Sequence, residues 1–250
     1  MTPAKEGQPR GGKAIQVVSL SFFRFPHGVS RLWAFAMMGL ARPALRRTEG
    51  IGFWKLCGSG TGEGFTPLPE TGVYAILATW PDLQSARRQT RDAPVYRRYH
   101  RRAVDSWTVF LSPVSVRGAW SRQSPFEVGD TTAGPGPVAA LTRATLRVSN
   151  LWRFWRRVPD ISAAIGADPA VTFKIGIGEV PLLHQVTFSI WPDSASMARF
   201  ARADGPHARA IHAVREGDWF REELYARFRI LGASGHWPGG PHLTPAGPKP

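Results

Sequence analysis

The segment His184-Gln-Val-Thr-Phe-Ser-Ile-Trp-Pro-Asp193 decides the fold, because Val73-Tyr-Ala-Ile-Leu-Ala-Thr-Trp-Pro-Asp82 repeats its pattern. In each segment a strand-like run of apolar and β-branched residues ends at Trp-Pro-Asp, and helical sequence follows. The two tryptophans are 191 − 80 = 111 positions apart. A repeat of this length predicts two related structural units in one chain.

Further landmarks repeat in the same order. Asp92-Ala-Pro94 and Asp204-Gly-Pro206 each resemble a helix cap with proline in the first turn, and they are 204 − 92 = 112 positions apart. Upstream, Leu32-Trp33 matches Leu151-Trp152 at an offset of 151 − 32 = 119. The larger upstream offset predicts a shorter loop in the second unit, opposite the glycine-rich segment that begins at Gly58.

Each unit reads as strand, helix, strand, strand, helix, strand, which is the order of a ferredoxin-like unit. The first strand, first helix and last strand are expected at 16–25, 30–45 and 107–111 in the first unit, and at 139–148, 150–165 and 225–231 in the second. Two such units usually pair their sheets face to face. The sequence therefore predicts an α+β fold in which tandem ferredoxin-like repeats form a pseudo-dimer resembling a dimeric α+β barrel.

The domain boundaries follow from composition. With 250 residues, 43% of them hydrophobic, the chain can bury a substantial core. Segments rich in Pro and Gly mark the boundaries between its parts. The expected parts are a disordered tail (1–14), a first ferredoxin-like half (15–128), a linker (129–137), a second half (138–234) and a tail rich in Pro and Gly (235–250).

Targeting signals and disulfides are not expected. The longest apolar run, Trp33–Leu40, is far shorter than the ~20 residues that a membrane-spanning helix needs. The first fourteen residues lack the apolar stretch of a secretory signal. Cys57 is the only cysteine, which excludes an internal disulfide and a cysteine-based metal cluster and agrees with a reducing compartment. We therefore expect a cytoplasmic protein.

The net charge of +14 favours an anionic partner. Nucleic acid, anionic lipid and an acidic protein are all such partners. The charge is equally explained by a basic face that contacts only solvent. The arginines stand in short scattered clusters, without the recognition motif of a groove-binding fold. Nucleic acid is therefore not an expected partner.

Common catalytic motifs are missing. The alternating glycines from Gly58 to Gly64 fit neither phosphate-binding spacing, so we expect a flexible loop there that can act as a lid. No nucleophile elbow, zinc-protease helix or calcium loop occurs, and hydrolysis finds no support. Ten Trp and fourteen Phe predict a wide apolar interior, although an ordinary aromatic core explains any one of them equally well.

Two histidines are expected to point inward. If Asp204 caps a helix, His207 shares an apolar stripe with Ile211 and Val214. His184 shares a strand face with Val186, Phe188 and Ile190. For His207 a buried structural histidine and a metal ligand are about equally plausible readings.

The repeat separates the remaining histidines. At the offset of 112, His207 corresponds to Val95 and His212 to His100. The first unit thus has an apolar contact where the second has an imidazole. His212 and His100 are expected to face solvent.

Several long runs resemble the spheroidene monooxygenase family, the acyclic carotenoid 2-ketolases of purple phototrophic bacteria. The runs are 31–35, 53–67, 154–159, 173–181, 184–193 and 217–228. The resemblance covers about residues 15 to 231, and several runs in one order are far more specific than any single motif above.

The resemblance implies a haem-dependent monooxygenase that uses O₂ on an acyclic carotenoid. Two successive hydroxylations at C-2 would give the ketone, with haem b as cofactor and ferredoxin as electron donor. Such a substrate implies contact with the inner or photosynthetic membrane. We assign His207 as the ligand of the haem iron and His184 as the catalytic pocket residue that hydrogen-bonds dioxygen. A non-catalytic haem or carotenoid carrier, and a cofactor-free or haem-degrading monooxygenase, remain alternatives.

Overall fold

The structure, a computed structural model, describes residues 15–26, 28–64, 66–129, 135–156, 169–202 and 219–243. The strands of the first half are β1 (Val17–Arg24), β2 (Trp54–Gly60), β3 (Pro69–Trp80) and β4 (Asp105–Gly118). Those of the second half are β5 (Val138–Leu146), β6 (Phe173–Gly178), β7 (His184–Trp191) and β8 (Phe220–His236). The helices are α1 (Val29–Leu40), α2 (Arg42–Arg46), α3 (Thr61–Gly64), α4 (Leu83–Asp92), α5 (Pro94–His100), the short 3₁₀ helix η1 (Val148–Asn150) and α7 (Ser194–Arg202).

The eight strands close into one antiparallel barrel in the order β1-β3-β2-β6-β7-β5-β8-β4. Within the first half the neighbours run β4-β1-β3-β2, and within the second half β8-β5-β7-β6. The halves meet where β2 pairs with β6 and where β4 pairs with β8. The prediction of a mixed fold of helices and strands built around a barrel is confirmed.

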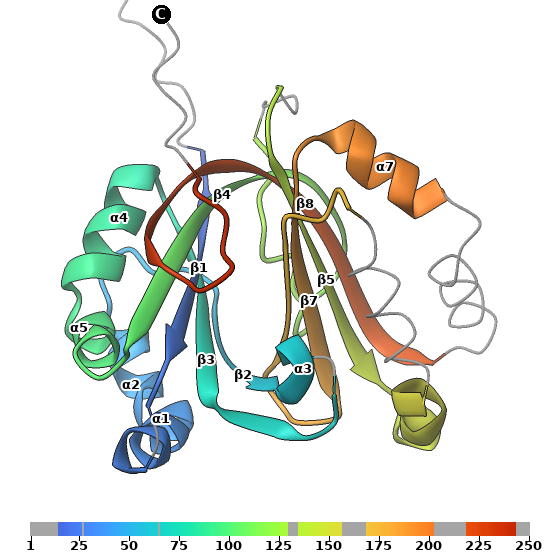
Figure 1. The fold of residues 1–250 in the computed structure, drawn as a ribbon. Coiled ribbons are helices and arrows are strands. Elements are labelled where there is room, and N and C mark those ends of the chain that lie inside the picture. The colour runs from blue at the N-terminus through green and yellow to red at the C-terminus, as the bar shows by residue number, and fades with distance from the viewer. Residues whose placement is uncertain are drawn as a thin grey trace, which may run out of the picture.

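Helices cover the outside of the barrel. In Figure 1, α1, α2, α4 and α5 lie on one side of it and α7 on the other. Alternate residues of each strand face opposite ways, so Leu20 and Phe22 fill the barrel interior while Val17 and Phe23 contact the helices. Among the helices that the structure describes, none is both long and apolar enough to cross a membrane.

Several element boundaries differ from the sequence prediction. The expected helix 30–45 is divided into α1 and α2, and Pro43 lies in the first turn of α2. Strands β4 and β8 are longer than expected, and β8 runs past residue 234 to His236. Beyond it, Trp237 and Leu243 pack against the barrel interior. The tail 1–14, linker residues 130–134 and the expected helix beyond residue 156 lie outside the described residues.

The glycine-rich segment forms regular structure, which corrects the expectation of a flexible loop. It supplies the end of β2 and all of α3, which packs on β6. A Cβ on Gly64, whose φ is +89°, would lie 1.7 Å from the carbonyl oxygen of Gly176. Glycine is needed because two backbones approach closely here, not because a phosphate binds.

Candidate functional site

One end of the barrel interior holds a cluster of charged side chains. They come from both halves, on strands whose inward-facing neighbours are apolar. The cluster consists of Lys55 on β2, Trp120 after β4, Arg143 on β5, Glu179 after β6, His184 on β7 and Glu222 on β8. We call this set the charge cluster.

Glu179 is the centre of the charge cluster. Its carboxylate accepts hydrogen bonds from Trp120 Nε1 at 2.6 Å and faces Lys55 Nζ at 2.8 Å. Burial by itself would raise the pKa of this carboxyl, but the adjacent His184 ring, Lys55 ammonium and Trp120 N–H lower it to about 2. Glu179 therefore stays ionised at neutral pH, inside the barrel.

Arg143 links the two carboxylates of the cluster. Its side chain is only 2% exposed, forms an ion pair with Glu222, and has Nη2 3.8 Å from Glu179. Glu222 also accepts the backbone N–H groups of Ser121 at 3.1 Å and Arg122 at 2.7 Å. Both of those residues have positive φ, so Glu222 holds a strained turn over this end of the barrel.

His184 points into the barrel beside Glu179. Its Nδ1 is buried, lies 3.5 Å from Glu179 Oε2, and makes no well-formed hydrogen bond. An imidazole with a carboxylate at one ring nitrogen has the arrangement found in metal ligands and proton carriers. The neighbouring Cys57 is fully buried, which raises the pKa of its thiol and keeps it unreactive.

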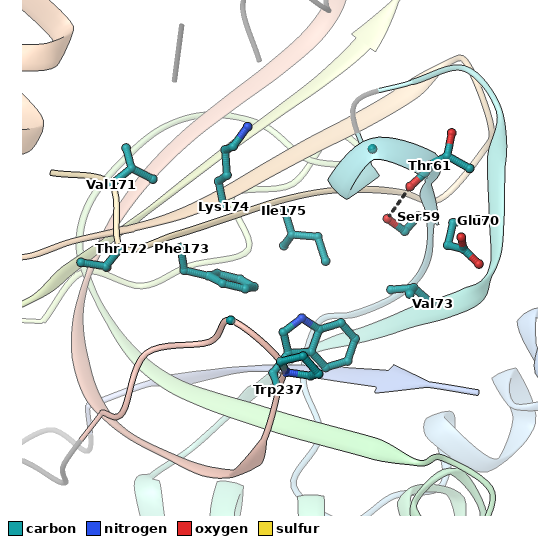
Figure 2. Close-up of a pocket in the computed structure, with 14 residues that line it drawn as sticks. Ser59, Thr61, Glu70, Val73, Val171, Thr172, Phe173, Lys174, Ile175 and Trp237 are labelled. Carbon is teal, nitrogen blue, oxygen red and sulfur yellow. Dashed lines mark hydrogen bonds between the residues drawn. The ribbon is translucent and has the colours of Figure 1, made fainter. Parts of the chain in front are cut away.

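The opposite end of the interior contains a pocket of about 390 Å³. It lies at the seam between the halves, where β2 and β6 share only the pairs Gly58↔Gly178 and Ser59↔Ile177. Figure 2 shows Val73, Phe173, Ile175 and Trp237 converging on the pocket. The pocket lining is therefore mixed, with these apolar side chains beside polar ones.

Aromatic rings form the floor of this end. Phe22 lies between Trp237, at 5.7 Å between ring centroids, and Phe173, at 6.0 Å. Trp107 contacts Phe173 at 5.0 Å. Polar side chains line the pocket as well, namely Ser59, Thr61, Glu70, Thr172 and Lys174. The aromatic and aliphatic side chains can pack against an apolar ligand, while the polar ones can contact a polar group on it.

The outer face of the second half-barrel carries small side chains. Ala140, Thr142, Ala144, Thr187 and Ser189 point away from the interior, on strands β5 and β7. On the same face, Arg229 has a buried Nε that finds no hydrogen-bond partner among the residues that the structure describes. A buried guanidinium nitrogen in this state is a site where an acceptor is missing.

The predicted site residues fall in different places. His207 lies outside the described residues. His184 belongs to the charge cluster and is not among the residues that line the pocket. In the described part of the chain, no group of three or more His, Cys, Asp or Glu side chains is placed to hold a metal ion.

The expectation for His100 was wrong. The structure places both ring nitrogens in contacts, Nδ1 with Ser106 Oγ at 3.1 Å and Nε2 with the carbonyl of Thr90 at 3.0 Å. The ring also packs against Phe23. The helix pattern alone put His100 among exposed arginines and could not show that α5 turns this residue toward β4.

The sequence reasoning also missed Arg143, Glu179 and Glu222. One signal was available, because Arg143 has the same strand parity as the apolar residues Ala139 and Leu141. A charge on a buried face requires a partner.

Comparison with known proteins places the chain in a family. It is 50% identical over 226 residues to spheroidene monooxygenase of Cereibacter sphaeroides, covering 90% of this chain and 70% of that protein. It is also 50% identical to spheroidene monooxygenase of Rhodobacter capsulatus, with 89% and 93% coverage. The chain belongs to the spheroidene monooxygenase family. The Rubrivivax gelatinosus member is 33% identical, with 84% and 80% coverage.

Solved structures agree on the fold of this spheroidene monooxygenase family member. An aldoxime dehydratase superposes with a TM-score of 0.60 at 11% identity, covering 87% of this chain and 82% of that one. A second, in complex with butyraldoxime, has a TM-score of 0.59 at 10% identity, with 88% and 81% coverage. No family model matches the chain. At these identities the likeness concerns the fold alone.

Proposed function

We propose that the chain is a carotenoid monooxygenase that converts the C-2 methylene of an acyclic, spheroidene-type carotenoid into a ketone. The observation that carries this proposal is 50% identity over about nine tenths of the chain to proteins named spheroidene monooxygenase. The apolar side chains of the pocket, such as Phe173, Ile175 and Trp237, support it, because a polyene contacts a protein mainly through apolar surface.

The proposed reaction balances as two hydroxylations. In each one, O₂, two electrons and two protons convert one C–H bond into C–O–H and release water. The second hydroxylation gives a gem-diol, which loses water to form the ketone. The electrons require an external donor, for which we propose reduced ferredoxin.

We propose haem b as the cofactor, held on the outer face of the second half-barrel. The side chains on that face, among them Ala140, Ala144 and Ser189, are small, and a flat group bound there would replace whatever now covers them. The unpartnered Nε of Arg229 would suit a haem propionate. Bound haem would supply the oxidising power to activate O₂. The protein would supply a ligand for the iron, a guanidinium that pairs with a propionate, and apolar side chains that contact the substrate.

His207 is the proposed ligand of the haem iron. Its counterpart in the repeat is Val95, which is buried against the outer face of the first half-barrel. By that equivalence His207 would face the small side chains of the second half. His184 lies on the other face of β7, inside the barrel, with Val186 and Phe188. His184 would therefore reach haem only if haem lies inside the barrel.

We further propose that part of the polyene lies in the seam pocket. Trp237 and Phe173 would stack on the chain, and Val73 would close one side. Val171 also lines the pocket and packs with the cluster on the outer face of the second half. The pocket thus runs from the interior toward the proposed haem face.

We also propose that the two halves are tandem ferredoxin-like repeats. The identical strand orders support this, as does the equivalent pairing of Trp80 with Val17 and of Trp191 with Val138. A duplicated unit explains how one copy can keep a structural core while the other changes toward a cofactor. The cell location that we propose is the cytoplasm, with peripheral attachment to a membrane.

The decisive experiment combines spectrum and turnover. Protein expressed with haem supplementation should show an intense Soret band, and with reductant and ¹⁸O₂ it should give a labelled 2-keto carotenoid. His207→Ala should lose haem, His184→Ala should keep haem with slower oxidation, and exposed His242→Ala should match the parent.

The other outcomes assign the alternatives. Loss of haem from His184→Ala but not from His207→Ala would place haem inside the barrel and reverse the two roles. Stable haem without turnover would favour a carrier. Turnover by a colourless protein would favour a cofactor-free enzyme.

A further inference from the structure

Helix α1 presents apolar side chains to solvent. Val29 is 83% exposed, Leu32 70%, Phe35 66% and Leu40 70%. These residues recur at helical spacing on the face opposite the buried Ala34 and Met37. A surface helix normally turns polar residues outward, whereas Arg31 is the only charged residue of α1. The exposed face therefore lacks the polar surface that water favours.

Arginines surround this apolar face. Residues 28–48 contain four arginines and no acidic residue, and residues 94–104 likewise contain four arginines and no acidic residue. Seven of the eight are exposed, namely Arg42, Arg46, Arg47, Arg97, Arg98, Arg101 and Arg102. Helices α2 and α5 carry four of these seven, and the other three follow directly after the two helices, which lie beside α1 (Figure 1). The guanidinium of Arg102 stands 4.4 Å from the ring of Trp33 on α1.

The mouth of the seam pocket adjoins α1. Arg31 forms an ion pair at 3.6 Å with Glu70, a residue that lines the pocket. Two residues earlier, Leu68 is 66% exposed. In Figure 1 the turn that leads into β3 lies at the same end of the molecule as α1. The apolar face, the arginines and the pocket rim thus share one end.

We propose that the exposed face of α1 docks the protein on an anionic lipid bilayer. The apolar side chains enter the boundary between headgroups and acyl chains, and the surrounding arginines pair with headgroup phosphates. A docked protein has its pocket mouth near the lipid, from which a carotenoid could enter. This use of the docking rests on the proposed function, but the docking itself does not. An acidic protein would match the arginines but not the apolar centre, and a second copy would bring like charges together.

The test measures binding of the purified full chain to carotenoid-free vesicles. Phosphatidylcholine vesicles with and without phosphatidylglycerol are compared by cosedimentation at low and high salt. The parent should prefer anionic vesicles, and salt should weaken its binding because the Debye length falls from ~10 Å at 0.1 M to ~3 Å at 1 M. Arg42→Gln, Arg46→Gln and Arg47→Gln together should reduce both the preference and the salt effect.

A matched pair of variants locates the surface. Leu32→Ser, Phe35→Ser and Leu40→Ser together should weaken binding by at least about tenfold, because each removes a large side chain from the lipid boundary. Val148→Ser with Trp152→Ser removes side chains of similar exposure, 74% and 73%, from the corresponding part of the second half and should bind like the parent. Unchanged circular dichroism would show that each variant folds.

Three results would overturn the proposal. The first is parent-like binding by the α1 variant, and the second is an equal loss in the Val148 and Trp152 control. The third is a parent that ignores vesicles but forms a dimer that the α1 substitutions dissociate. Since no carotenoid or reductant is present, these results are independent of the oxidation assay. An α1 variant that oxidises detergent-dispersed carotenoid but not vesicle-bound carotenoid would separate docking from catalysis.

Discussion

The outer faces of the two half-barrels have the same strand pairing, but at several matching positions their side chains differ in size and polarity. Val17 pairs with Trp80 in the first half as Val138 pairs with Trp191 in the second. Counted from these pairs, Phe23, Ile76 and Phe110 of the first half correspond to Ala144, Thr187 and Arg227 of the second. One backbone arrangement thus supports a bulky apolar face in one copy and a small, polar face in the other.

This difference in side chains indicates a structural role for the outer face of the first half and a binding role for that of the second. Phe23 is buried, with ring centroids 5.0 Å from Tyr99 and 5.2 Å from His100. The first half therefore forms a close-packed layer of helices on sheet, and it also carries α1 and its arginines. The second half has small side chains at several of the matching positions on its outer face, such as Ala144 and Thr187, and this is the face where we propose the cofactor.

The largest expected effect comes from truncating matched positions to alanine. Ile76→Ala should lower the free energy of unfolding by about 2–5 kcal/mol, because Ile76 is fully buried between sheet and helices. Thr187→Ala, at the matching position, should cost less than about 1 kcal/mol because Thr187 is only partly buried. Urea unfolding of the haem-free protein measures both. Equal losses would mean that the two faces are packed alike.

Acid should weaken the charge cluster, which joins the halves through Lys55 and Glu179. The pKa of Glu179 is about 2 in the folded protein against an ordinary value near 4.5. A lowered carboxyl pKa stabilises the fold above pH ~4.5, and this stabilisation is lost as pH falls toward ~2, a change on the order of 3 kcal/mol. Glu179→Gln should have a lower free energy of unfolding at neutral pH, and this free energy should depend less on pH within that range. A parental slope in the Gln variant would assign the acid sensitivity to other carboxyls.

The fold could be predicted from sequence because its signals are local and occur twice. Trp-Pro-Asp follows a strand and opens a helix in both halves, and Asp82 and Asp193 do cap α4 and α7. Strand ends were less predictable, because pairing between β4 and β8 across the seam extends both strands. That extension depends on contacts more than 100 residues apart in the chain, such as Ser106 with His236.

The candidate site was less visible in the sequence. His184 was recognised as inward-facing from strand parity alone, but its partner Glu179 lies after β6, in a segment without periodicity. The charge cluster takes its members from six strands or their ends, so no single window of sequence contains it. The pocket depends in the same way on Trp237, in a segment that composition marked as a tail.

A smaller effect is expected from filling the second half's outer face. Ala144 occupies the position that Phe23 holds in the first half. Ala144 is buried, so Ala144→Phe should lower the stability of the haem-free protein by about 1–3 kcal/mol and, because a bulky ring would compete for the same space, weaken haem binding about tenfold. Haem titration followed at the Soret band gives the affinity, with Ala139→Val inside the barrel as a control for general disturbance. Unchanged haem affinity in Ala144→Phe would move the proposed haem site off this face.

The smallest effect should come from the two helix caps, where the halves are alike. Asp82 accepts a hydrogen bond from the backbone N–H of Ser85 at 2.7 Å, and Asp193 from that of Ser196 at 2.6 Å. These backbone hydrogen bonds lower the pKa of both carboxyls, so both caps are ionised at neutral pH and stabilise the N-termini of their helices.

Replacing either capping Asp with alanine removes the same hydrogen bond in each half, so a difference between the two variants reflects how each helix is packed. Asp82→Ala should lower the melting temperature by a few degrees, because α4 buries Ala86 and Thr90 in the first half's core and cannot loosen alone. Asp193→Ala should instead speed amide hydrogen exchange in α7 with a smaller change in melting, because among the described residues α7 joins only a small cluster, through Met197 and Phe200. If both variants melt alike and exchange alike, α7 is as firmly attached as α4, and the contrast between the two outer faces does not extend to their helices.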